Sequence, residues 1–362
     1  MTDQIHRILT RVQKPARYVG GEYNQIVKRK QDVDVRVAFC FPDTYEIGMS
    51  NIGMRILYGV MNEMPGVWCE RVFAPWGDME AEMRANRLPL WALESHDPVR
   101  DFDLVAFTLG YEMCYSNVLN MLELSGLPLL AKDRKGLEGI VFAGGVCTVN
   151  PEPLADFIDF FSIGEGEEST REIIECYRAA KRQGLSKQEF LREAAKLEGV
   201  YVPSLYTHTY NPDGTLAAIT PAPGAPARVK KRIVQDLDRA YFPTKTIVPS
   251  TQIVHDRSNL EIFRGCIRGC RFCQAASATG RSAPNPRIPC ADRRSNRSRI
   301  PATARSPLPA SRPPTTASLR RWPTVCSATA SRARSTSRCP VSARTISRAS
   351  SCCASRRCAR AA

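Results

Sequence analysis

The sequence lacks any uninterrupted apolar run long enough to span a bilayer. Its first twenty residues, MTDQIHRILTRVQKPARYVG, are charged and do not contain the apolar core of a signal peptide. We therefore expect a cytoplasmic protein with no membrane partner. In that reducing compartment, the 14 cysteines are expected to be free thiols or metal ligands rather than disulfides.

Acidic residues are almost absent from the last part of the chain. The whole chain has a formal net charge of +15, but residues 275–362 contain 18 Arg, one Asp (Asp292) and no Lys or Glu. This tail alone carries a net charge of +17, and the other 274 residues together carry −2. Because the basic charge belongs to the tail, it does not support specific nucleic-acid binding by the rest of the protein.

Large apolar residues are also scarce in the tail. Leu, Ile and Val together number 7 in its 88 residues, and Phe, Tyr and Met are absent. Burial of this small number of apolar side chains cannot offset the conformational entropy lost on folding. We therefore expect disorder after about residue 275.

The abrupt change of composition predicts a frameshift in a GC-rich gene near Ala275. Codons can be rebuilt from the third base of one tail codon and the first two bases of the next. In this phase, Thr279–Ala283 can encode YRPVR, Ser311–Ala317 can encode LSSADYS, and Trp322–Ser327 can encode VADRLF. We therefore interpret the tail as the product of a one-base deletion, with a natural disordered basic tail as the alternative.

Short apolar runs alternate with helix-like stretches over residues 31–200. The runs are typical of buried strands, and they lie at 33–41, 67–73, 103–109, 139–145 and 157–163. This β-α-β-α order predicts an α/β domain with a doubly wound, Rossmann-like parallel sheet. In such sheets, ligands bind at the carboxyl ends of the strands.

We divide the chain into five segments. They are an N-terminal extension (1–30), the α/β domain (31–200), a hairpin and connector (201–250), a strand with a cysteine loop (251–274) and the tail (275–362). The hairpin turn is predicted at Asn211–Gly214, because Asn, Pro, Asp and Gly favour tight turns.

Three cysteines, Cys266, Cys270 and Cys273, have the spacing C-x3-C-x2-C. Thiolates bind iron in clusters, and three ligands leave one iron of a [4Fe–4S] cluster open for chemistry. A zinc site is the alternative, but zinc sites usually pair C-x2-C with a second pair of ligands, and His255 is the one histidine nearby. The spacing therefore predicts an iron–sulfur cluster.

The segment FRGCIRGCRFCQA resembles the cluster motif of radical S-adenosylmethionine (SAM) enzymes. LEIFRG is similar to the first strand of that family's partial (β/α) barrel, and Phe272 matches the aromatic residue before the third cysteine. The resemblance implies that the open iron binds SAM, with Phe272 on the SAM side of the loop, and that SAM is cleaved reductively to a 5′-deoxyadenosyl radical. It also implies an electron donor such as flavodoxin or ferredoxin.

The loop DTYEIG after the first strand resembles the D-x-H-x-x-G loop of cobalamin-binding domains, with Tyr45 in place of the ligating His. A neutral phenol is a poor metal ligand, so cobalamin at this position would lack its lower axial ligand. AGG and GEGE, each after a later strand, are similar to further motifs of these domains, although turn glycines and helix-start acids are the structural alternative. The resemblance implies a cobalamin site at Asp43, Tyr45, Gly48, Gly144, Gly145, Gly164 and Glu165.

From about residue 17 to 275, the motif order RYVGGEYN, PDTYEIGMSNIG, AGG, GEGE and FRGCIRGCRFCQA resembles bacterial radical SAM proteins with an N-terminal cobalamin-binding-like domain. We therefore predict a radical SAM enzyme family member of unknown substrate, inactive as translated because the tail replaces the barrel. One alternative is a non-catalytic corrinoid- or nucleotide-binding Rossmann module. The other is an RNA-binding protein that uses its Arg-rich tail.

Overall fold

The computed structural model describes residues 2–237, 239–257, 261, 263–265, 270–271, 273 and 283–284. The chain divides into two compact units. The first unit, called the α/β domain below, contains residues 1–235 and 246–254, and the second contains residues 236–245 and 255–362.

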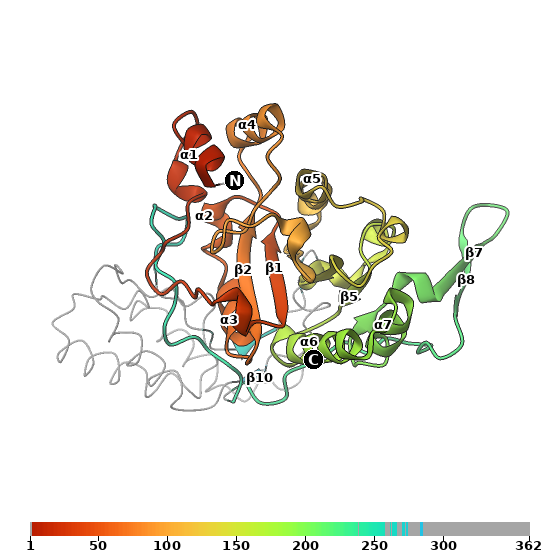
Figure 1. Ribbon diagram of the computed structural model, residues 1–362. Coiled ribbons are helices and arrows are strands. Elements are labelled where there is room, and N and C mark those ends of the chain that lie inside the picture. The colour runs from red at the N-terminus through yellow and green to blue at the C-terminus, as the bar shows by residue number, and fades with distance from the viewer. Residues whose placement is uncertain are drawn as a thin grey trace. The chain divides into compact units, whose positions relative to one another are not determined.

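A six-stranded sheet forms the centre of the α/β domain (Figure 1). Its strands are β1 (Val35–Phe41), β2 (Val67–Phe73), β3 (Leu104–Thr108), β4 (Ile140–Gly144), β5 (Phe160–Ser162) and β6 (Val200–Tyr201). Their order is β2-β1-β3-β4-β5-β6; all neighbours are parallel except β5 and β6, which are antiparallel. The predicted α/β fold with a mainly parallel, Rossmann-like sheet is confirmed, and each of the five predicted strands is present.

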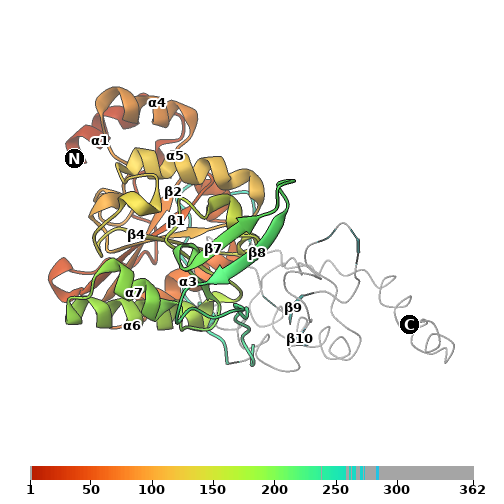
Figure 2. The ribbon, with the colours of Figure 1, turned by 90° about the vertical axis from the view of Figure 1, so that its right-hand side faces the viewer.

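Helices cover both faces of the sheet, which explains why the strands are continuous apolar runs (Figure 2). They are α1 (Thr2–Leu9), α2 (Tyr45–Gly48), α3 (Ile52–Asn62), α4 (Gly77–Asn86), α5 (Tyr115–Ser125), α6 (Gly166–Gln183) and α7 (Lys187–Ala194). Val35 and Val37 of β1 pack with buried residues of α3, α6 and α7. Ala38 and Cys40 of the same strand pack with α1, α4 and α5 on the other face.

Local sequence sets several helix ends. The Asn51 side chain accepts a hydrogen bond from the Met54 backbone N–H at the start of α3 (3.0 Å). Ser186 and Glu189 form a reciprocal capping box at the start of α7. None of the described helices is both long and apolar enough to cross a membrane.

A hairpin of β7 (Tyr206–Tyr210) and β8 (Leu216–Pro221) projects from the α/β domain (Figures 1 and 2). Its turn closes where the sequence predicts it, with the Gly214 N–H donating to the Asn211 carbonyl oxygen (2.9 Å). In the second unit, β9 (Phe263–Arg264) pairs antiparallel with β10 (Ala283–Pro284). β9 lies in the segment predicted as the first barrel strand. β10 lies in the tail predicted to be disordered, and these two residues form a strand there; the other tail residues lie outside the described residues.

Candidate functional site

The residues assigned to cofactor binding in the α/β domain gather at one edge of the sheet. Asp43 follows β1, Gly144 ends β4 with Gly145 directly after it, and Gly164 and Glu165 follow β5. Since these strands are parallel, their carboxyl ends meet at the edge where sheets of this type bind ligands. The parallel topology therefore places these motifs along one edge of the sheet.

Asp43 is held by the protein's own groups. One carboxylate oxygen accepts the Thr44 backbone N–H (2.8 Å), and the other accepts a hydrogen bond from the Tyr111 hydroxyl. That bond, together with burial, raises the pKa of Tyr111 to about 12, so the phenol stays neutral. Tyr111 was missed by sequence reasoning, although it lies just after the apolar run that forms β3.

Tyr45 lies in the core, with only 1% of its surface exposed. Its hydroxyl donates to a Glu22 carboxylate oxygen (2.9 Å) and accepts the Ser250 backbone N–H (3.4 Å). Burial, and then the nearby Glu22 charge, raise the pKa of Tyr45, so its phenol remains neutral. A neutral, hydrogen-bonded phenol does not fit the role of a corrinoid ligand.

Behind Tyr45 lies a buried ion-pair network centred on Arg71 of β2. Arg71 is 1% exposed; it contacts Glu22 through two nitrogens (2.8 and 2.9 Å) and Glu94 through Nε (2.6 Å). Burial raises the pKa of Glu22, but the Arg71 charge and the hydrogen bonds to the carboxylate together outweigh burial, so the pKa lies below its ordinary value. Burial keeps the pKa of Glu94 raised despite the same partner. The network fixes the RYVGGEYN segment against the sheet.

Two glycines of the predicted site make room for neighbouring parts of the chain. A Cβ at Gly48 would lie 2.2 Å from a ring carbon of Phe73, and a Cβ at Gly145, where φ is +106°, would lie 2.5 Å from the Leu109 carbonyl oxygen. Glycine is required at both positions by close packing within the domain. The space that a ligand would need beside these glycines is filled by protein.

Gly164 and Glu165 contact the chain that follows the hairpin. Gly164 forms an isolated parallel bridge with Arg232, and the Glu165 N–H donates to the Arg232 carbonyl oxygen (2.9 Å). The Glu165 carboxylate accepts the Val234 backbone N–H (2.5 Å). The GEGE motif therefore binds a later segment of its own chain.

Large apolar side chains are exposed along the carboxyl edge. They follow four adjacent strands, β2, β1, β3 and β4, and have exposed fractions of 41–85%: Ile47, Trp76, Tyr111, Met113, Val146 and Val149. The sequence did not identify these residues as a surface group, because single exposed apolar residues in loops are common. Exposed apolar side chains that accumulate along one edge are typical of a contact surface.

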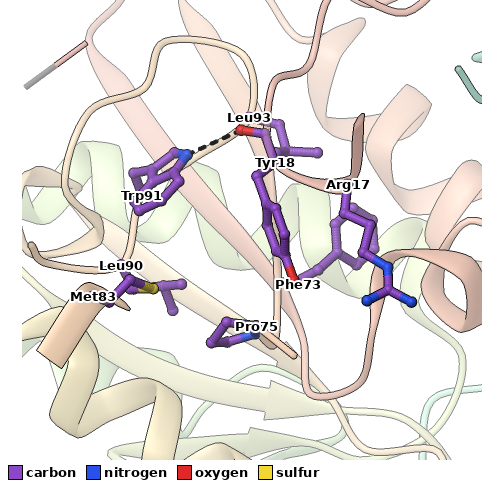
Figure 3. A pocket seen from close by; sticks show the side chains of 8 residues that line it. All are labelled: Arg17, Tyr18, Phe73, Pro75, Met83, Leu90, Trp91 and Leu93. Atoms are coloured by element: carbon purple, nitrogen blue, oxygen red, sulfur yellow. Dashed lines mark hydrogen bonds between the residues drawn. The ribbon is translucent and has the colours of Figure 1, made fainter. Parts of the chain in front are cut away.

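A cavity near this edge is lined by residues from four segments (Figure 3): Arg17, Tyr18, Phe73, Pro75, Met83, Leu90, Trp91 and Leu93. The Trp91 indole N–H donates to the Tyr18 carbonyl oxygen (3.3 Å), and the Trp76 backbone N–H donates to the Tyr18 hydroxyl (3.1 Å). The cavity volume of about 10 Å³ holds one water molecule. It is too small for an organic cofactor.

Four cysteines of the α/β domain are core residues: Cys40, Cys69, Cys114 and Cys147. Burial raises the pKa of the Cys114 thiol, and burial followed by the Glu112 charge raises the pKa of Cys147 to about 11. Such thiols are protonated at neutral pH and are therefore poor nucleophiles and metal ligands. Among the described residues, no group of three His, Cys, Asp or Glu side chains is arranged to hold a metal ion.

The cysteine loop is described in part. Cys270 is exposed and Cys273 is half-buried, and the Cys273 N–H donates to the Cys270 carbonyl oxygen (3.1 Å). This turn brings the two residues close together, as ligands supplied by one short loop must be. Cys266 and Phe272 lie outside the described residues. The predicted three-cysteine cluster site stays a prediction.

Comparisons with known proteins bear on the α/β domain. Residues 53–203 match a family model described as radical SAM proteins, N-terminal. An uncharacterised protein of Methanocaldococcus jannaschii is 26% identical over 243 residues, which are 66% of this chain and 40% of that protein. The chain thus spans two fifths of the length of this relative. The matched residues run from α3 to the end of β6, so this part of the α/β domain is similar to the N-terminal domain of radical SAM proteins.

Proposed function

We propose that this chain derives from a radical SAM enzyme in which Cys266, Cys270 and Cys273 hold a [4Fe–4S] cluster. The observation that carries the proposal is the family match over residues 53–203, in a chain that also contains C-x3-C-x2-C. The matched segment does not include the cysteines. The domain and the cluster motif are therefore two separate features that favour the same chemistry.

The chain's own part in this chemistry is to supply ligands and surroundings. Cys270 and Cys273 lie on one turn, and the exposure of Cys270 leaves its thiol open to bind iron. Phe272 is proposed to line the SAM side of the loop, and exposed Arg271 to offset negative charge at the cluster. When bound, a cluster of this kind supplies the electron that cleaves SAM to methionine and a 5′-deoxyadenosyl radical.

The proposal contains no corrinoid step. Tyr45 is a buried neutral phenol, and the space beside Gly48, Gly145 and Gly164 is filled by protein. These observations do not fit a cobalamin site. The substrate and the reaction that follows SAM cleavage are left open, and the electron donor is proposed to be a flavodoxin or ferredoxin.

We also propose that the chain as given does not complete a radical SAM barrel. Residues 275–362 contain 7 Leu, Ile and Val residues and no Phe, Tyr or Met. Barrel strands need continuous apolar side chains on both faces, which this composition does not provide. The cluster can therefore form on this chain without SAM turnover.

Anaerobic cluster reconstitution tests the ligand assignment. Because the tail holds six further cysteines, the test compares variants in a background in which these six are replaced by Ser. We expect about four irons per chain, lost in Cys270→Ser and Cys273→Ser and retained in Cys176→Ser, a half-buried cysteine of α6. Equal iron content in all three variants would contradict the proposal.

A further inference from the structure

Two segments that follow the hairpin pack against the rest of the α/β domain, on either side of residues 236–245, which belong to the second unit. We call residues 231–235 the first connector segment and residues 246–254, which extend beyond the predicted connector, the second connector segment. Both contacts use residues that the motif resemblance assigned to cofactor binding. The structure therefore shows which groups these predicted cofactor-binding residues contact.

The first connector segment lies along the Gly164-Glu165 turn. The Arg232 N–H donates to the Ile163 carbonyl oxygen (2.9 Å) and its carbonyl oxygen accepts the Glu165 N–H (2.9 Å). A Cβ at Gly164 would lie 2.1 Å from the Arg232 carbonyl oxygen, and φ at Gly164 is +114°. Glycine is therefore needed here so that the connector backbone can approach.

Side chains reinforce this first contact. The Arg232 guanidinium pairs with Glu168 and Glu172 of α6 (both 2.8 Å) and with Glu198 (3.4 Å). The Glu165 carboxylate accepts the Val234 N–H (2.5 Å). Glu168 in the first turn of α6 and Glu172 further along it thus share a basic connector residue as their partner.

The second connector segment lies along the N-terminal segment and the loop after β1. The Val248 N–H donates to the Tyr23 carbonyl oxygen (3.0 Å), and the Ser250 N–H donates to the Tyr45 hydroxyl (3.4 Å). The Val254 N–H reaches the Glu46 carbonyl oxygen (3.5 Å). Ile247 and Ile253 are buried in the same core as β1 and α3.

We propose that the Tyr45-Glu46 turn and the Gly164-Glu165 turn form a two-point clamp for the connector and do not bind a corrinoid. The clamp fixes the point at which the chain leaves the α/β domain before the cysteine loop. This exit point is Val254, which lies beside the loop after β1. Tyr45 joins this clamp to the Glu22–Arg71 pair, so the N-terminal segment takes part in it. The clamp does not depend on the cluster proposal, since every contact lies in the α/β domain.

Hydrogen exchange of the full chain, followed by mass spectrometry, tests the first contact. Gly164→Ala is compared with Gly184→Ala, because Gly184 also has a positive φ (+65°) but open space around it. We expect exchange at residues 231–235 to rise by about tenfold or more in Gly164→Ala, with β3 and β4 still protected, and no such rise in Gly184→Ala. Equal exchange at 231–235 in the two variants overturns the clamp.

A second variant keeps this test decisive if Gly164→Ala does not fold. Glu165→Ala removes the carboxylate that accepts the Val234 N–H and leaves the Gly164 backbone unchanged. The same local rise in exchange is expected at 231–235. Unchanged exchange there in a folded Glu165→Ala protein overturns the role assigned to Glu165.

Tyr45→Phe tests the second contact, with Tyr177→Phe as its matched control. Tyr177 is also fully buried, and its hydroxyl lies within hydrogen-bond distance of two acceptors, an Asp103 carboxylate oxygen (3.2 Å) and the Leu137 carbonyl oxygen (3.1 Å), away from the connector. We expect faster exchange at residues 248–254 in Tyr45→Phe alone. The same exchange pattern in both variants shows a general stability effect and overturns the clamp at this end.

Titration with hydroxocobalamin tests the corrinoid half of the proposal. We expect the absorption spectrum of the cofactor to remain that of free hydroxocobalamin in the presence of the full chain. A saturable spectral change that is lost in Tyr45→Phe or Gly164→Ala would overturn the inference, because these residues would then bind the cofactor.

Discussion

Replacement of Arg71 by Met should strongly destabilise the α/β domain. Arg71 is the shared partner of Glu22 and Glu94, and all three side chains are at most 1% exposed. Arg71→Met keeps most of the side-chain volume but leaves two buried carboxylates without their cation. The Tyr45 hydroxyl still donates to Glu22, which satisfies one of its oxygens.

The magnitude follows from the cost of an uncompensated buried charge. Removal of one partner from a buried ion pair costs about 3–5 kcal/mol. The cost should depend on pH, because without Arg71 both carboxylates have pKa values raised above those of the unfolded chain. A raised carboxyl pKa favours the folded state at low pH, so the penalty relative to wild type should shrink as pH falls from 7 to about 5.

Urea denaturation of both proteins at the two pH values measures this penalty. Arg84→Met is the control, since Arg84 forms ion pairs on the surface with Glu80 and Glu123 and should give no measurable change. A triple variant, Glu22→Gln, Arg71→Met and Glu94→Gln, should recover part of the loss because no buried charge remains. A penalty for Arg71→Met below about 1 kcal/mol, or one that grows as pH falls, would refute the reasoning.

Three further predictions follow from the same contacts. Gly48→Ala should lower the free energy of unfolding by about 1–3 kcal/mol, because its Cβ would overlap the Phe73 ring. Gly77→Ala, which has open space at its Cβ, should not lower it, and equal urea midpoints for the two variants would contradict this prediction. In the native chain, iodoacetamide should modify Cys270 quickly and Cys114 and Cys147 only after denaturation, as mapped by mass spectrometry; fast native modification of Cys114 would contradict its burial. The nucleotide sequence around codon 275 should open a long alternative reading frame on restoration of one base, and the frameshift interpretation fails if no single-base change does so.

The strands could be predicted because their signal is local. A parallel strand covered on both faces must be apolar throughout, so runs such as 33–41 and 103–109 identify β1 and β3 without any knowledge of their neighbours. The hairpin turn at Asn211–Gly214 is equally local, since its residue types favour that geometry.

The contacts at the carboxyl edge could not be predicted, because their partners are far apart in sequence. Glu22 and Arg71 are 49 positions apart, and no periodicity connects them. Gly164 leaves room for a close backbone approach, but the approaching group is Arg232 of the same chain rather than a ligand. A glycine in a sequence motif indicates that another group packs close to the backbone at that position. The three-dimensional structure is needed to identify that group.

Formation of 5′-deoxyadenosine from SAM, under anaerobic reducing conditions, tests the central claim most directly. The assay compares the chain as given with the product of the frame-restored gene, each after cluster reconstitution. We expect SAM cleavage by the restored protein, its loss in Cys270→Ser, and no cleavage by the chain as given. A restored protein that binds a cluster but never cleaves SAM would contradict the assignment to radical SAM chemistry.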